Sequence, residues 1–141
     1  MEHTKLFLAL LGASSAHADA SRKAFSELGL TDGQPKILYI LYRQDGYVQK
    51  DLAEICGIRQ STLTVLLARM EEQGYIYKEI CHISGMKRAY QIFLTEKGRV
   101  KAQELELVIE ELEKKSFNGF SEEEHQMILK LLSKVEENMK N

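Results

Sequence analysis

The twenty residues DLAEICGIRQSTLTVLLARM, from Asp51 to Met70, contain two short apolar patterns of helical spacing with a glycine between them. A helix-turn-helix packs two short helices at a steep angle. It needs a small residue where they touch, a glycine at the corner and buried apolar residues at set offsets. Ala53 supplies the small contact and Gly57 the corner. The positions that such a unit must bury are Leu52, Cys56, Ile58, Leu63 and Leu66. The stretch therefore predicts a helix-turn-helix with helices over 49–56 and 59–73.

Burial of those positions defines the outward face of the second helix. The residues left on it are Arg59, Gln60, Ser61, Thr62, Thr64, Val65, Ala68 and Arg69. Its first turn is short, polar and free of acidic residues, so it can approach a DNA groove closely. Gln60 can pair with adenine, and Ser61 or Thr62 can contact base edges or phosphates. We expect a surface for double-stranded DNA; the alternative is a solvated face of a module that binds protein instead.

The residues before this unit predict another helix. Gly29 and Leu30-Thr31 indicate one helix stopping and a second starting, because Thr31 and Gln34 have capping-box spacing and Pro35 suits a first turn. The core face of this helix is predicted at Ile37, Leu38, Ile40 and Leu41, with its end at Asp45-Gly46.

After Gly74 the pattern changes from helical to extended. Residues 75–83 and 89–94 are rich in aromatic and β-branched side chains and flank residues 84–88, so they predict a hairpin with a basic, mobile tip. Thr95 begins a long helix whose apolar side is predicted at Val100, Leu105, Val108, Ile109 and Leu112. Ser121 and Glu124 cap a last helix carrying Ile128, Leu131, Leu132, Val135 and Met139. This last spacing is typical of a seam between helices and predicts a dimer interface built from both chain ends.

The stretch LFLALLGASSAHADA, residues 6–20, has two interpretations. One is the end of a secretory leader, but the start carries Glu2 against Lys5 and the strongly apolar run is short. The other is an amphipathic helix, which we favour because helical spacing continues through the supposed cleavage point. Its apolar positions are Phe7, Leu10, Leu11, Ala18, Phe25 and Leu28.

Composition limits the remaining possibilities. A chain of 141 residues with 28% charged and 44% hydrophobic residues is long enough for one folded domain with helical extensions. The net charge of −2 comes from residues 99–141, which hold seven basic and ten acidic side chains, so a local basic face remains possible. No stretch approaches the roughly 20 apolar residues that span a bilayer, and two cysteines make no disulfide framework. A cytoplasmic location is the simplest interpretation.

The segment STLTVLLARMEEQGYI (61–76), the basic hairpin tip and LTEKG (94–98) together resemble the multiple antibiotic resistance regulator (MarR) family of bacterial transcription factors. The resemblance covers nearly the whole chain and implies a mainly α fold with a small β-hairpin wing. It implies an obligate dimer whose terminal helices interlock, with dimerisation in residues 1–30 and 99–141 and a DNA-binding domain in 31–98. It also implies that residues 59–73 form the recognition helix and that Lys87 and Arg88 reach a minor groove or phosphate.

Two positions differ from the family pattern. The family commonly has aspartate and two basic residues at the wing tip, where this chain has Met86-Lys87-Arg88, and often a basic residue where it has Val65.

Members of this family often respond to small aromatic or lipophilic ligands or to cysteine oxidation. The ligand candidates are His17 and Phe25 on the first helix with Tyr39 and Tyr42 on the second, and the alternative is that most of them are core residues. Cys56 is expected to be an inert buried thiol. A copper(I) site at Cys81, His82 and Met86 is disfavoured, because strand alternation puts Cys81 and His82 on opposite faces.

The sequence offers no metal-ligand cluster, no phosphate-binding loop, no cofactor motif and no nucleophile with base and orienter, so no enzyme is expected. We expect a homodimeric repressor, released by a small-molecule effector, that binds a pseudo-palindromic operator with half-sites roughly 10 bp apart. Lys50 and Lys78 are weaker phosphate candidates. The alternatives are a metal- or redox-responsive regulator of the same fold and a winged-helix protein-interaction module.

Overall fold

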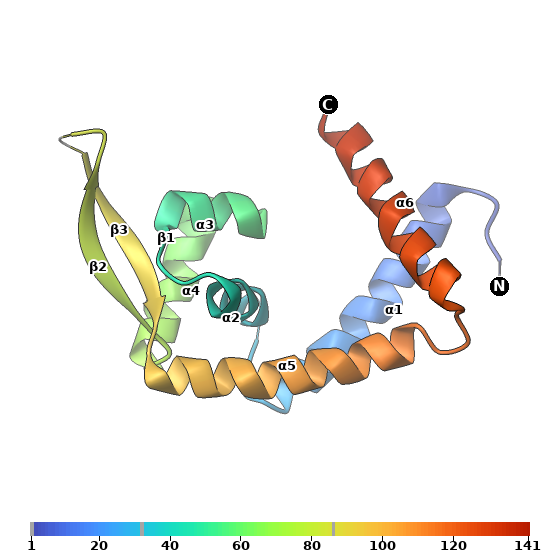
Figure 1. The fold of residues 1–141 in the computed structure, drawn as a ribbon, viewed down its shortest axis with the longest axis horizontal. Coiled ribbons are helices and arrows are strands. Elements are labelled where there is room, and N and C mark those ends of the chain that lie inside the picture. The colour runs from blue at the N-terminus through green and yellow to red at the C-terminus, as the bar shows by residue number, and fades with distance from the viewer. Residues whose placement is uncertain (1, 32, 86) are drawn as a thin grey trace. The chain divides into compact units, whose positions relative to one another are not determined.

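The computed structural model describes residues 2–31, 33–85 and 87–141, and divides them into two compact units, 1–109 and 110–141. Over these residues six helices and a three-stranded sheet form, and α5 passes from the first unit into the second. The elements, labelled in Figure 1, are α1 Leu6–Ser26, α2 Gln34–Arg43, β1 Tyr47–Val48, α3 Gln49–Cys56, α4 Gln60–Glu72, β2 Ile76–Ile83, β3 Lys87–Leu94, α5 Glu96–Ser116 and α6 Glu122–Lys140.

The predicted helix-turn-helix is present as α3 and α4. Gly57 ends α3 in the left-handed conformation at φ 68°, which a residue without a Cβ adopts readily. Its N–H donates to the Glu54 carbonyl, and the Ile58 N–H donates to the Ala53 carbonyl, both at 3.1 Å. The predicted bounds of α3 are confirmed, while α4 is one residue shorter at each end because Arg59 is its N-cap and Gln73 its C-cap.

The core of the first unit forms where α2, α3, α4, the sheet and the start of α5 meet. Of the positions predicted to be buried in the helix-turn-helix, only Ile58 is partly exposed; the others are in the core. The buried hydrophobic residues are Leu30, Ile37, Leu38, Leu41, Leu52, Ala53, Cys56, Leu63, Leu66, Leu67, Met70, Tyr75, Ile76, Ile92, Leu94, Ala102 and Leu105.

The start of α2 differs from the predicted capping box. Gly33, not Thr31, is the N-cap, and no side chain caps the helix; Asp32 lies outside the described residues. Half of the predicted reciprocal contact exists, since the Thr31 N–H donates to Gln34 Oε1 at 3.2 Å. The Gln34 amide donates to Gln73 Oε1 at 2.8 Å and is only 1% exposed, so this side chain connects α2 to the end of α4. Local sequence patterns do not predict this hydrogen bond, because Gln73 is distant from Gln34 in the chain.

The sheet has the order β1-β3-β2, with both pairs antiparallel. The short strand β1 was not predicted; Tyr47 pairs with Ile92 and Val48 with Gln91. The prediction that Lys87 and Arg88 belong to the hairpin tip is wrong, because they are the first residues of β3, opposite Ile83 and His82. Cross-strand pairing continues almost to the turn, and the β2–β3 hairpin extends beyond the helices α3 and α4 (Figure 1).

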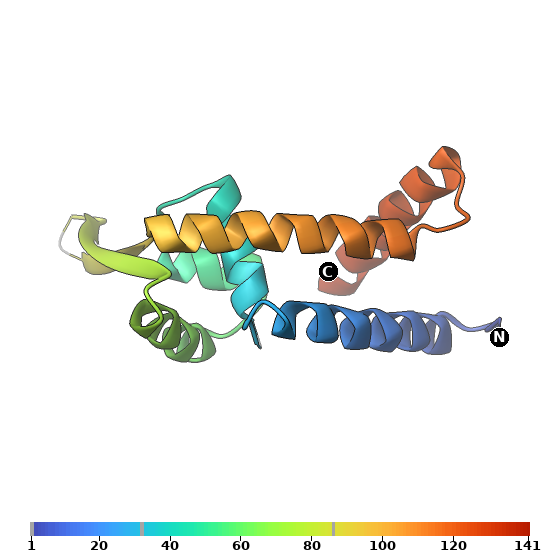
Figure 2. The same ribbon diagram turned by 90° about the horizontal axis from the view of Figure 1, so that it is seen from below.

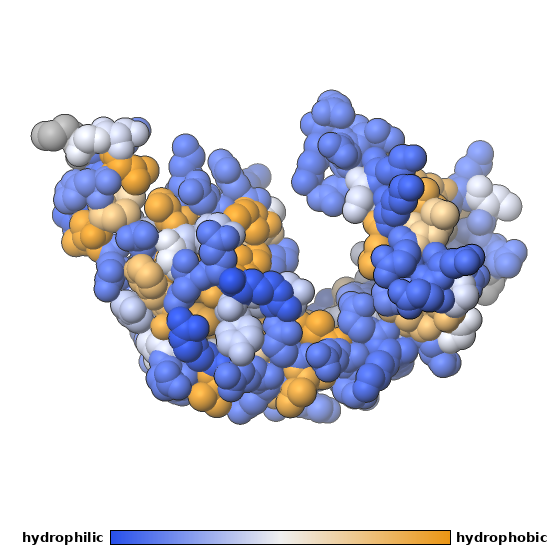
Figure 3. Space-filling view, viewed as in Figure 1, coloured by the Kyte–Doolittle hydropathy of each residue, from blue (hydrophilic) through white to orange (hydrophobic). Residues whose placement is uncertain are grey.

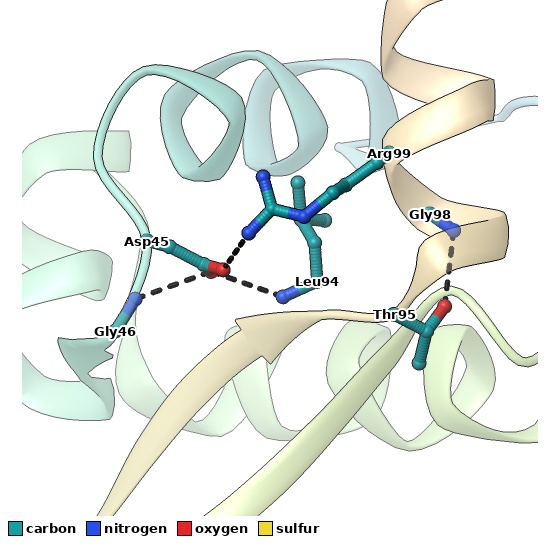
Figure 4. A network of polar contacts seen from close by, with 6 residues as sticks. All are labelled: Asp45, Gly46, Leu94, Thr95, Gly98 and Arg99. Atoms are coloured by element: carbon teal, nitrogen blue, oxygen red, sulfur yellow. Dashed lines mark hydrogen bonds and ion pairs between the residues drawn. The ribbon is translucent and has the colours of Figure 1, made fainter.

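A polar network fastens the base of the hairpin to the start of α5 (Figure 4). Asp45 Oδ1 accepts the N–H groups of Gly46 at 3.2 Å and Leu94 at 3.0 Å, while Oδ2 pairs with Arg99 Nη2 at 2.8 Å. Thr95 Oγ1 accepts the Gly98 N–H at 3.0 Å, as an N-cap residue directly before α5 does, and this agrees with the predicted start of the helix. A Cβ at Gly98 would lie 2.1 Å from the Tyr75 carbonyl oxygen, so only glycine fits there.

Two further observations concern the long helices. Within the first unit α5 passes α2 (Figure 2). Two hydrogen bonds of an ion pair between Arg43 and Glu106 join the two helices. Val100, predicted on the apolar side of α5, is 48% exposed, because Ala102 and Leu105 instead face the core. The capping box of Ser121 and Glu124 at the start of α6 is confirmed.

Candidate nucleic-acid interface

Helix α4 presents the face that the sequence predicts. Its buried residues are Leu63, Leu66, Leu67 and Met70. All eight residues predicted to face outward are exposed, with Val65 reaching 70%. The segment from Arg59 to Met70 contains no acidic side chain, so this part of the face repels no phosphate; Glu71 and Glu72 follow at the end of α4.

Gln49 is a residue of this interface that sequence reasoning missed. From the first turn of α3 its Nε2 donates to Thr64 Oγ1 at 2.8 Å, and Thr64 Oγ1 donates to the Gln60 carbonyl at 2.9 Å. The contact crosses the helix-turn-helix and joins its two helices at their exposed edge. The only available signal was the position of a long amide side chain at the start of α3.

The wing carries positive charge mainly on one face. Residues alternate between the faces of a strand, so Lys78 and His82 share the face of the buried Ile76. Their cross-strand neighbours on that face include Tyr90 and Arg88. Arg88 Nη2 donates to the Tyr90 hydroxyl at 3.2 Å, and the Arg88 and Lys78 cations lie 5.8 and 5.9 Å from the Tyr90 ring centroid.

Lys87 projects from the opposite face of the hairpin, because it precedes Arg88 directly in β3. The two predicted wing residues therefore cannot approach one phosphate group from the same side of the sheet. Hydrophobic side chains also reach the surface over this hairpin, among them Ile80 and Ile83 (Figure 3). Lys50, the other weaker candidate, is exposed in the first turn of α3.

The structure separates the four ligand candidates. Phe25, Tyr39 and Tyr42 pack against the core while remaining partly exposed, whereas His17 is exposed on α1 and hydrogen-bonded to Ser21 at 3.5 Å. The guanidinium of Arg43 lies 3.4 Å from the Tyr39 ring centroid. Its hydrogen bonds to Glu106 raise the pKa of Arg43.

The two cysteines lie in different surroundings. Cys56 is 3% exposed, and burial raises the pKa of its thiol against an opposing effect of nearby Lys36. A raised pKa leaves less thiolate, the reactive form. Cys81 is partly exposed, and it faces away from His82; Met86, the third residue of the copper hypothesis, lies outside the described residues. In the described part of the chain no three His, Cys, Asp or Glu side chains gather as metal ligands would.

A helix-turn-helix followed by an antiparallel hairpin defines a winged helix-turn-helix protein. The sequence matches the MarR family over residues 30–85. It is 31% identical over 115 residues to the helix-turn-helix-type transcriptional regulator YybA of Bacillus subtilis strain 168, a match covering 82% of this chain and 75% of that protein. The chain belongs to the MarR family of transcriptional regulators.

Solved structures agree with this assignment. A MarR family transcriptional regulator from Listeria monocytogenes, crystallised with a 26mer DNA, superposes with a TM-score of 0.84 at 26% identity, covering 97% of this chain and 90% of that one. A MarR family regulator from Silicibacter pomeroyi gives a TM-score of 0.78 at 25% identity, covering 92% and 86% of the two chains. Among the described residues, no helix is both long and apolar enough to cross a membrane.

Proposed function

We propose that this regulator binds double-stranded DNA through the exposed face of α4, with the β2–β3 hairpin gripping the flanking backbone. The observation that carries the proposal is the α4 surface itself. Its reading candidates are Arg59, Gln60, Ser61, Thr62, Thr64 and Arg69, all exposed, and Lys87 and Arg88 extend the contact onto the wing. The crystallisation of the similar Listeria monocytogenes regulator with a 26mer DNA supports DNA binding here.

We further propose that the working form is a homodimer. Support comes from α1 and α6, which have no buried residue and leave large apolar side chains in water, including Phe7 and Leu11 on α1 and Leu131 and Leu132 on α6. Residues 1–30 and 99–141 would provide dimerisation and 31–98 the DNA-binding domain. Two recognition helices related by a two-fold axis would suit a pseudo-palindrome with half-sites roughly 10 bp apart.

Control of the regulator is proposed to be repression relieved by a small aromatic or lipophilic effector, in the cytoplasm and without catalysis. The aromatic side chains of Phe25, Tyr39 and Tyr42, which are partly exposed and pack against the core of the first unit, support a ligand site there. A titration of the protein with salicylate, monitored by tyrosine fluorescence and by release from DNA, tests this part. Quenching of tyrosine fluorescence without release of the protein from DNA would contradict the proposed relief of repression by an effector.

Gel retardation of the DNA upstream of the protein's own gene tests the DNA proposal. We expect retardation at low salt that disappears steeply as salt rises, because counterion release dominates affinity. A protein-interaction module would retard no duplex at any salt. A metal- or redox-responsive regulator would change affinity on addition of copper(I) or peroxide, and we expect no change.

Two substitutions distinguish contacts to the DNA backbone from contacts to the bases. Arg88→Ala is expected to weaken binding to all duplexes and to reduce the salt slope by about one, because one phosphate charge is no longer neutralised by the protein. Gln60→Ala is expected to change preference at one base pair of the half-site. Lys140→Ala, which removes the same charge from the end of α6, serves as the control. If neither Arg88→Ala nor Gln60→Ala alters binding, the assigned surface is wrong.

A further inference from the structure

The middle of the α4 reading face carries small and apolar side chains. Successive residues of an α-helix are separated by about 100° around its axis, so the positions opposite the buried stripe of Leu63, Leu66, Leu67 and Met70 follow directly. They are Ser61, Val65, Ala68 and, in the last turn, Glu72, with Thr64 beside the first three. From Ser61 to Ala68 this outward stripe therefore holds only small and methyl-bearing side chains, and the basic and amide side chains of the face lie on either side of it.

Val65 has no packing role that explains a β-branched apolar residue at this position. It is 70% exposed, and the core stripe on either side is complete without it. A valine is also a poorer helix former than alanine, so local helix stability does not favour it. Its side chain is an exposed apolar group on the side of α4 opposite the core.

The hydroxyl of Thr64 is already engaged within the protein. A threonine hydroxyl has one hydrogen and two lone pairs. The hydrogen goes to the Gln60 carbonyl at 2.9 Å, and one lone pair accepts from Gln49 at 2.8 Å. While these bonds persist, Thr64 has no donor to offer to purine N7 or to thymine O4, and its methyl group and one lone pair remain available.

We propose that Val65 and the Thr64 methyl group make this regulator specific for thymine C5-methyl groups at the centre of each half-site, with Gln49 as the positioning residue that keeps the Thr64 hydroxyl engaged. The proposal rests on the DNA binding proposed above. In the major groove the thymine methyl is the single apolar group presented by the four bases, and apolar side chains are its natural contacts. The half-site is accordingly expected to require thymine where α4 points most directly into the groove.

The test uses a site selected from a random duplex library with the full-length protein, then synthesised with deoxyuridine in place of every thymidine. The replacement removes only C5-methyl groups and leaves every Watson–Crick and groove hydrogen-bonding group in place. Loss of one buried methyl corresponds to ~0.8 kcal/mol, or about fourfold in Kd, and two half-sites give about 15-fold. A non-selected duplex measured in parallel is expected to show a ratio near one.

Variants assign the effect to residues. Val65→Ala is expected to reduce the uracil penalty to less than half, whereas Val100→Ala, which shortens an exposed valine on α5, leaves it unchanged. Thr64→Val keeps the methyl and removes the hydroxyl, so the penalty persists; Thr64→Ser keeps the hydroxyl and removes the methyl, so it falls. Gln49→Ala is expected to let the Thr64 hydroxyl rotate and to relax the thymine requirement.

The outcomes are separable. If the library yields no bound duplex, the proposed DNA binding fails. If a selected site is bound equally well with thymine and uracil, or if Val65→Ala leaves the uracil penalty intact, DNA binding stands and the thymine inference is overturned. If Thr64→Val lowers the uracil penalty and Thr64→Ser keeps it, the contact belongs to the hydroxyl, and the role given to Gln49 is overturned.

Discussion

Helix α3 has 8 residues and buries three of them, whereas α1 has 21 residues and α6 has 19, and neither buries any. All three helices carry apolar side chains at helical spacing. The stripe of α3 meets α4 and the sheet, while the stripe of α6 remains in water. The difference teaches that an apolar stripe specifies a contact without saying whether its partner belongs to the same chain.

Substitution on the α6 stripe is expected to produce the largest effect. Leu132→Asp would place an unpaired carboxylate in the proposed dimer seam, which costs several kcal/mol and corresponds to a dimer weakened by more than about 100-fold. Ser133→Asp adds the same charge one position further along, outside the stripe, and serves as the control. Sedimentation velocity over a concentration series measures both. Equal dissociation of the two variants would remove α6 from the interface.

The core of the first unit supplies the next effect. Leu63→Ala removes a side chain that is 0% exposed, so we expect a loss of about 2–5 kcal/mol in the free energy of unfolding. Its exposed neighbour Thr62→Ala should change that free energy by no more than about 0.5 kcal/mol. Urea denaturation at one protein concentration provides the values. Similar losses of unfolding free energy in the two variants would contradict the assignment of Leu63 to the buried face of α4 and Thr62 to the exposed face.

The Asp45 network at the base of the wing gives a smaller effect. Asp45→Ala deprives the Leu94 and Gly46 N–H groups of their acceptor, with an expected loss of about 1–3 kcal/mol in unfolding free energy. Asp45→Asn keeps an oxygen acceptor and loses only the Arg99 ion pair, whose cation is 43% exposed, so its loss should be under about 1 kcal/mol. Hydrogen exchange at the Leu94 amide follows the same order. Equal losses of unfolding free energy in Asp45→Ala and Asp45→Asn would show that the ion pair with Arg99, and not the acceptor for the two N–H groups, provides the stabilisation.

The exposed wing is expected to show the smallest effect. Tyr90→Phe removes the hydroxyl that accepts from Arg88 and keeps the ring beneath the cation, so DNA affinity should fall by less than about twofold. Tyr90→Ala also removes the ring and should cost more. Fluorescence anisotropy with labelled operator DNA distinguishes them. A larger loss for Tyr90→Phe than for Tyr90→Ala would contradict the role of the ring.

Most of the helix-turn-helix and its outward face were predictable from sequence. Leu52, Ala53, Cys56, Leu63 and Leu66 are buried and α3 has its predicted bounds, because helical periodicity and a corner glycine act over a few neighbouring residues. The sequence-based predictions were wrong where a residue distant in the chain determines the local structure. Gln34 bonds to Gln73 instead of completing a local cap, β1 exists only by pairing with β3, and Lys87 and Arg88 extend a strand that the sequence pattern placed in a turn.

The amino-acid sequence by itself determined which side of α4 faces water and that this side lacks acidic groups from Arg59 to Met70, since both follow from residue order within one helix. Only the tertiary structure decided that Gln49 engages the Thr64 hydroxyl, that Asp45 ties the wing to α5, and that Lys87 and Arg88 occupy opposite faces. These are contacts between elements, or depend on strand pairing. Their existence is set by how the chain packs in three dimensions, which no local spacing encodes.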